Sequence, residues 1–174
     1  MQKILPLLSE PEQKIKMINQ AELQKMFNYQ NGKLIAKTNS KSRKVGDIVG
    51  SLNSNGYLVA SVKSKIYRIH RLIFMYHYGF MPKQIDHING VRSDNRIENL
   101  REATLNQNNQ NRRATAQSGV KGVYWHKQIN RWIASICINK KNIHLGSFLH
   151  KDDAAQVAIS ARKTIHGEFA RGEA

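Results

Sequence analysis

The sequence of 174 residues predicts an α+β fold built from two units that follow one another along the chain. In the first unit, short runs of β-forming residues alternate with turn formers such as Asn31-Gly32 and Asn55-Gly56, which is typical of antiparallel hairpins. In the second unit, three apolar strand-like runs precede one amphipathic helix. We therefore expect an N-terminal helix over 1–28, a first domain over 29–112, a linker over 113–119 and a second domain over 120–171.

The N-terminal segment has the pattern of a peripheral helix. Ser9 is a suitable N-cap, because Glu12 follows three residues later as in a capping box. Apolar residues then recur at roughly helical spacing, and we expect the helix to end near Asn28.

The rest of the first unit is predicted to be mixed. A small antiparallel sheet is expected between Gly32 and Ile69, followed by a helix over 70–78 and a strand and turn over 85–91. Asp94 is expected to cap a short helix with Ile97 and Leu100 inward, and 106–113 to be helical or extended.

The second unit is predicted to be a three-stranded antiparallel sheet packed on one helix. Its strands are expected over 123–125, 132–138 and 143–146, and its helix over 152–166. Because one helix can cover only one face, the other face of this sheet should meet solvent and carry basic and aromatic side chains.

The charge of the chain favours a polyanionic partner. Lys and Arg number 28 against 12 Asp and Glu, which gives a net charge of +16. No acid falls between Ala103 and Lys151, so the charge is unevenly placed. Nucleic acid is the first expectation and an anionic membrane surface the second, while a basic protein that uses charge only for solubility is the alternative. A single cysteine, Cys137, excludes an internal disulfide and fits a reducing compartment, and we expect a cytoplasmic protein.

Adjacent Asp86 and His87 carry the candidate chemistry. Neighbouring residues of a strand point to opposite faces, so Asp86 can bind a metal ion while His87 takes a proton from water. We expect Asn99 to hold the imidazole through a hydrogen bond and Asn108 to offer a neutral oxygen ligand. Carboxylate, amide and phosphate oxygens suit one Mg²⁺ or Mn²⁺ ion rather than Zn²⁺.

These residues resemble the HNH homing endonucleases of phages. The similar segments are 67–72, 86–90 and 94–101, with Asn108 and Asn111. The resemblance implies a ββα-metal fold, in which a hairpin and a helix surround one divalent ion. It implies that Asp86 and Asn108 are metal ligands, that His87 is the general base and that Asn99 orients the loop. His70 matches a recurrent histidine that could support the site or contact a phosphate, although a buried packing role is an equal alternative.

The second unit resembles the DNA-binding domain of plant ethylene-response factors, which lays a three-stranded sheet in the major groove. The similar segments include 122–125, 131–134 and 145–148. The resemblance implies contacts with double-stranded DNA, and we expect further contacts from basic residues of the first unit. The expected DNA-binding residues are Lys121, Tyr124, His126, Arg131 and His144, together with Arg71, Arg112 and Arg113. We expect Trp132 to belong to the core and leave Trp125 open.

The sequence thus predicts a metal-dependent, site-specific DNA endonuclease that leaves a 5′-phosphate and a 3′-hydroxyl. One site per chain predicts nicking by a monomer, without a membrane or an obligate protein partner. One alternative is a sequence-specific DNA-binding regulator with a silent nuclease fold. Another is a protein that binds or cleaves RNA, against which the few exposed-looking aromatics of the first unit argue.

Overall fold

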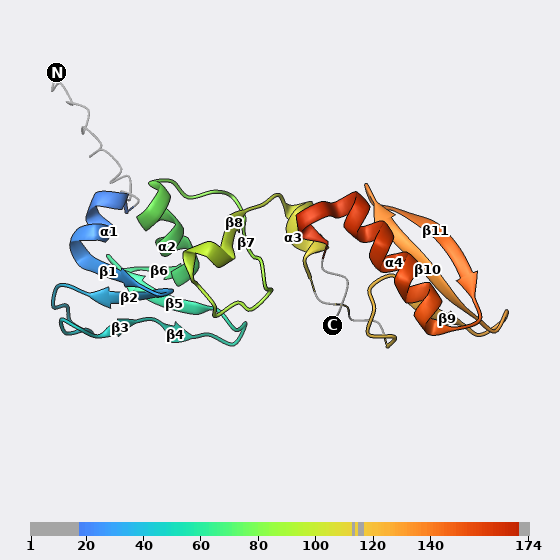
Figure 1. Ribbon diagram of the computed structural model, residues 1–174. Helices are drawn as coiled ribbons and strands as arrows, with labels where there is room; N and C mark the ends of the chain where they lie inside the picture. Colours follow the sequence, from blue (N-terminus) through green and yellow to red (C-terminus); the bar gives the residue numbers. More distant parts are fainter. Residues whose placement is uncertain (1–17, 113, 115–116, 171–174) are drawn as a thin grey trace, which may run out of the picture.

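The computed structural model describes residues 18–112, 114 and 117–170, and confirms the predicted α+β class (Figure 1). The first unit contains α1 (Gln20–Met26), β1 (Phe27–Gln30), β2 (Lys33–Ala36), β3 (Ile48–Val49), β4 (Ser51–Leu52), β5 (Leu58–Val62), β6 (Lys65–Arg68), α2 (Ile69–Tyr78), β7 (Ile85–His87), the 3-10 turn η1 (Ile97–Asn99), β8 (Leu100–Glu102) and α3 (Leu105–Gln110). The second contains β9 (Val123–His126), β10 (Arg131–Ile138), β11 (Lys141–Phe148), α4 (Lys151–His166) and η2 (Gly167–Phe169). No helix in the described ranges is long and apolar enough to cross a lipid bilayer.

The first described helix begins later than the sequence predicts. Ser9 lies outside the described residues, and α1 begins at Gln20, after an extended Asn19 that accepts a hydrogen bond from the Glu22 amide. The Glu22 carboxylate accepts one in return from the Asn19 amide, which completes a capping box. The helix ends before Asn28 because Phe27 already belongs to β1 and is buried in the core.

The first unit has two small sheets where one was expected. Strands β1, β2 and β3 form one antiparallel sheet, and β4, β5 and β6 form another. The Asn31-Gly32 turn joins β1 to β2 with positive φ at both residues, as the sequence predicts for a tight hairpin. Helix α2 matches the predicted helix and buries Leu72 and Ile73 completely.

A hairpin and a short helix follow α2 and complete the first unit. Strand β7 pairs antiparallel with β8, with Asp86 opposite Arg101. A capping box between Thr104 and Gln107 starts α3. The short helix expected after Asp94 is only a 3-10 turn over Ile97–Asn99, and its N-cap is Arg96, not Asp94. Leu100 packs in the core and Ile97 against it, as expected, although Leu100 already begins β8.

The second unit is the predicted sheet on one helix. Its strand order is β11-β10-β9, and α4 covers one face through a small core of Val123, Ala134, Ala154 and Ala158. Trp132 is partly buried against this core, as expected, whereas 42% of Trp125 is exposed. The two indole rings meet edge to face at 5.3 Å.

Candidate nuclease site

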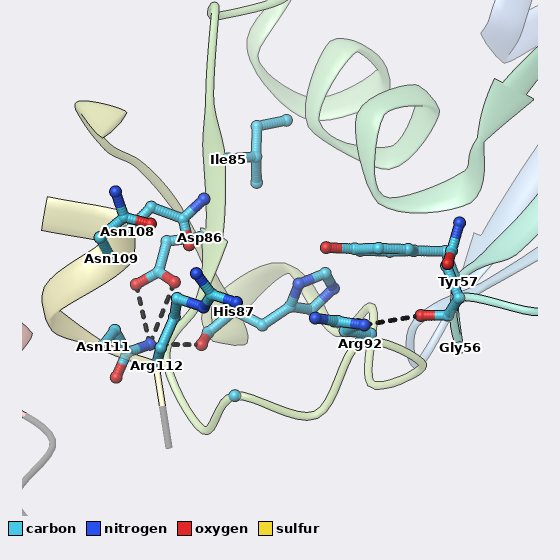
Figure 2. Close-up of a pocket in the computed structure, with 12 residues that line it drawn as sticks. Gly56, Tyr57, Ile85, Asp86, His87, Arg92, Asn108, Asn109, Asn111 and Arg112 are labelled. Atoms are coloured by element: carbon cyan, nitrogen blue, oxygen red, sulfur yellow. Dashed lines mark hydrogen bonds between the residues drawn. The ribbon is translucent and has the colours of Figure 1, made fainter. Parts of the chain in front are cut away.

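A polar cavity of about 600 Å³ lies where β7, the loop after it and α3 meet (Figure 2). The loop before β5 closes its other side. The lining residues are Asn55, Gly56, Tyr57, Ile85, Asp86, His87, Gly90, Arg92, Asn108, Asn109, Asn111 and Arg112. The structure therefore brings Asn108 of α3 together with Asp86 and His87 of β7.

Asp86 is buried and held from two sides. Arg101 donates from Nε and Nη2 to the Oδ2 atom of Asp86 at 2.9 and 2.8 Å. The Asn111 amide donates to both carboxylate oxygens, at 3.0 and 2.9 Å, and also to the main-chain oxygen of His87 at 2.7 Å (Figure 2). These donors offset the cost of burying a carboxylate and fix its direction. Neither Arg101 nor Asn111 was predicted from the sequence to have a role of its own.

His87 is buried beside this carboxylate, and its partner is not the expected one. The Nε2 atom of His87 lies 3.1 Å from the Oδ1 atom of Asn95. Burial lowers the pKa of the imidazole below its ordinary value, and Arg92 lowers it further, while Asn95, Asp86 and Asp94 raise it. The net lowering keeps the imidazole neutral near pH 7, so it can accept a proton.

Asn99 does not reach the imidazole, which corrects the expected hydrogen bond between them. Its Oδ1 accepts from the Asn89 amide at 3.0 Å, and its Nδ2 donates to the main-chain oxygen of Asp94 at 2.7 Å. Asn99 thus ties together two parts of the 88–99 loop. Since this loop carries Asn95, the effect of Asn99 on the imidazole is indirect.

His70 lies under the imidazole of His87, at the start of α2. The two rings meet edge to face at 4.9 Å, and only 3% of His70 is exposed. Burial first, and then His87, Arg68 and Arg71, lower the pKa of His70 to about 3. A neutral, buried ring supports His87 and does not face solvent.

Arg92 lines the cavity on the side away from Asp86, and Arg68 lies against the same tyrosine, Tyr57. The Arg92 guanidinium lies 5.2 Å from the centre of the Tyr57 ring, and that of Arg68 lies 4.4 Å from it. Arg92 also donates to the main-chain oxygen of Asn55 at 2.8 Å, so it is held in place (Figure 2). The sequence singled out neither arginine, because nothing local marks them as neighbours of the Asp-His pair.

The basic residues expected to bind DNA are spread over several places. Arg112 lines the cavity, whereas Arg71 donates to the main-chain oxygens of Pro82 and Lys83 and so holds the connection before β7. Arg113 lies outside the described residues.

Four residues expected to bind DNA share one face of the second sheet. His126 pairs with Arg131 across β9 and β10, Tyr124 pairs with Ile133, and His144 pairs with Ser135. Since side chains alternate along a strand, all four lie on the face opposite to Val123 and Ala134, which α4 covers. The four residues Tyr124, His126, Arg131 and His144 are called the open face below.

Lys121 is not part of the open face. Its ammonium group donates to the main-chain oxygens of Asn109 and Gln110, at 2.9 and 3.2 Å, at the end of α3. Burial first, and then Arg162 and Arg112, lower the pKa of Lys121 to about 8. The side chain therefore joins the two units.

The donors in the cavity fit a hard divalent cation. Asp86 supplies a carboxylate and Asn108 an amide, and both line the same polar space. Among the described residues there is no group of three or more His, Cys, Asp or Glu that could hold a metal ion. So few donors could not fill the coordination shell of a metal ion without help from other ligands. Mg²⁺ needs only one or two protein oxygens, because water and phosphate supply the rest.

Comparisons with known proteins match the part of the chain that holds this site. A family profile described as HNH endonuclease matches residues 67–110, which span α2, the β7–β8 hairpin and α3. "Protein 3.8" of Escherichia phage T7 is 32% identical over 99 residues, which are 53% of this chain and 79% of the phage protein. No solved structure matches the chain. The chain carries an HNH endonuclease domain over residues 67–110, and it belongs to the same family as phage T7 protein 3.8.

Proposed function

We propose that this protein is a Mg²⁺- or Mn²⁺-dependent, site-specific DNA endonuclease of the homing type. The observation that carries the proposal is that Asp86, His87 and Asn108 line one polar cavity. The net charge of +16 favours a nucleic acid in that cavity. Asp86 and Asn108 would hold one ion, which supplies charge stabilisation for the phosphate and for the departing 3′ oxygen.

His87 would act as the general base. Its Nε2 faces the amide oxygen of Asn95, which only accepts hydrogen bonds, so the imidazole proton resides on Nε2 and Nδ1 takes the proton from water. Attack by that water on phosphorus would break the bond to the 3′ oxygen, which takes a proton from solvent, and would leave a 5′-phosphate and a 3′-hydroxyl. Arg92, on the other side of the cavity, would neutralise a phosphate of the same strand.

The second unit would recognise the target sequence on DNA. Its three-stranded sheet with one helix, and its resemblance to the ethylene-response-factor domain, support placing the open face in the major groove. We propose that the nuclease domain spans 29–112 and the DNA-binding domain 120–171. The protein would act in the cytoplasm and without an obligate protein partner. One site per chain would produce a nick.

Nicking of supercoiled plasmid that carries the target, with Mg²⁺ or with chelator, tests the proposal. His87→Ala should bind target DNA like the wild type but cut it about 10²- to 10⁴-fold more slowly. His150→Ala is the control, because His150 is exposed at the start of α4. A wild-type protein that binds the target and never cuts it with any divalent ion would instead be the DNA-binding regulator.

A further inference from the structure

Arg101 connects the candidate metal ligand Asp86 to the far end of the chain. It lies on β8 directly opposite Asp86, with its side chain 13% exposed. Two of its nitrogens bind the Oδ2 atom of Asp86, and the third, Nη1, donates to the main-chain oxygen of Glu168 at 3.0 Å. Its guanidinium also lies 3.6 Å from the centre of the Phe169 ring, which is buried. Glu168 and Phe169 belong to η2, which follows α4 in the second unit.

The second candidate ligand, Asn108, is held by the same unit. Asn108 lies on α3, a helix of 6 residues, and so short a helix is not stable without tertiary contacts. The last carbonyl groups of α3 have no partners within the helix and need donors from elsewhere. Lys121 donates to the carbonyl oxygens of Asn109 and Gln110, and Arg162 from α4 donates to that of Gln110 at 3.0 Å. Donors from the second unit thus fix the end of the helix.

The two sets of contacts converge on the cavity from one side. The Oδ2 atom of Asp86 is saturated by Arg101 and Asn111, whereas Oδ1 is held by the Asn111 amide alone within the described part of the chain. Arg101 therefore orients the carboxylate so that one oxygen stays available beside Asn108. The orientation of Arg101 depends in turn on Phe169 and Glu168.

We propose that the second unit completes the metal site, with Arg101 as a positioning residue that Phe169 and Glu168 hold against Asp86. The inference rests on the proposed function and deepens it. The second unit then contributes to the metal site of the nuclease as well as to recognition of the DNA target. Outer-sphere groups of this kind change metal affinity by about 10- to 100-fold in other proteins, because a ligand that must first be oriented binds less tightly.

The experiment measures Mn²⁺ binding to the full-length protein by electron paramagnetic resonance, without DNA. Phe169→Ala removes the ring that holds Arg101, and Arg101→Lys keeps the charge but cannot hold both Asp86 and the ring. Each should weaken Mn²⁺ binding by about 10-fold or more. Phe148→Ala is the matched control, because Phe148 is a partly buried phenylalanine that packs against the core of the same unit. It should leave Mn²⁺ affinity unchanged.

A second readout separates positioning from general damage. Cleavage by both variants should need more Mg²⁺ for its half-maximal rate and should recover at high Mg²⁺, while their affinity for target DNA in chelator stays that of the wild type. Circular dichroism checks that each variant is folded, and Arg101→Lys serves if Phe169→Ala is not. Wild-type Mn²⁺ affinity in either folded variant would overturn the inference. A wild-type protein that neither binds Mn²⁺ nor cuts DNA would instead overturn the proposed function.

Discussion

The Oδ1 atom of Asn95 lies 3.1 Å from the Nε2 atom of His87, eight residues earlier in the chain. Asn95 is 2% exposed, so solvent does not compete for this contact. An amide oxygen only accepts hydrogen bonds, and the contact therefore places the imidazole proton on Nε2. If His87 is the base, Asn95 sets which of its nitrogens is free, and the 88–99 loop would then take part in the proposed chemistry.

Replacement of Asn95 by Leu tests this relationship. The variant keeps the size of the side chain but leaves the position of the imidazole proton unfixed, so we expect slower cleavage with unchanged DNA affinity. The loss should be smaller than that of His87→Ala. Because Asn95 raises the pKa of His87, its removal should also shift the acid limb of the pH–rate profile to lower pH. An unshifted profile at the wild-type rate would contradict the assignment.

The protonation of His70 predicts how stability depends on pH. Its pKa in the folded protein is about 3, against an ordinary value of 6.5, so the unfolded chain binds a proton that the folded one refuses. The contribution of neutral His70 to the free energy of unfolding is complete above pH 6.5. It is lost as the pH falls toward 3, by up to about 1.4 kcal/mol for each pH unit. Urea unfolding between pH 7 and pH 4 measures this slope.

The phenylalanine variant of the same position supplies the comparison. His70→Phe keeps the ring contacts with Tyr57 and His87 but cannot titrate, so its stability should fall less steeply in acid. His150→Phe, at an exposed position, should keep the wild-type slope. Equal slopes in His70→Phe and the wild type would show that His70 does not titrate as inferred.

The sequence predicts most of the helices and strands, but it does not predict which distant side chains contact the candidate site residues. Hairpin turns such as Asn31-Gly32, the period of α4 and the runs of β9 to β11 are local patterns, so their elements were found. The Asp86-His87 pair was also a local signal. Local patterns of this kind do not determine how segments distant in the sequence pack together. The split of the first sheet in two depends on which distant strands pair. The start of α1 at Gln20 is set by the local capping box of Asn19 and Glu22, which the prediction overlooked in favour of Ser9.

Contacts between distant residues account for the rest. Arg101 meets Phe169 and Glu168 across 67 residues of sequence or more, and nothing near Arg101 announces them. The division into two units that the sequence predicts suggests that removal of everything after Arg113 would weaken DNA binding far more than it changes the chemical step. The contacts of Arg101 and Lys121 predict instead that such a truncation weakens both metal binding and DNA binding.

Asn108 can be tested against a neighbour on the same helix. Asn108→Ala removes the proposed amide ligand, so the Mg²⁺ concentration for half-maximal cleavage should rise by about 10-fold or more. High Mg²⁺ should restore part of the rate. Asn106→Ala is the matched control, because Asn106 is exposed on α3 and does not line the cavity. Equal Mg²⁺ requirements for the two variants would remove Asn108 from the site. Chelator should abolish cleavage by all of them.

Salt dependence distinguishes the open face from the contact that joins the two units. If Arg131 binds a phosphate, Arg131→Ala should reduce the slope of log affinity against log salt by about 0.9. Lys121→Ala should leave that slope unchanged, because its ammonium group already binds the carbonyl oxygens of Asn109 and Gln110. It should instead raise the Mg²⁺ requirement, since α3 loses a donor at its end. Fluorescence anisotropy with labelled target DNA, between low and physiological salt, measures both slopes. A reduced slope in Lys121→Ala with a normal Mg²⁺ requirement would return Lys121 to the DNA interface and remove it from the contact between the units.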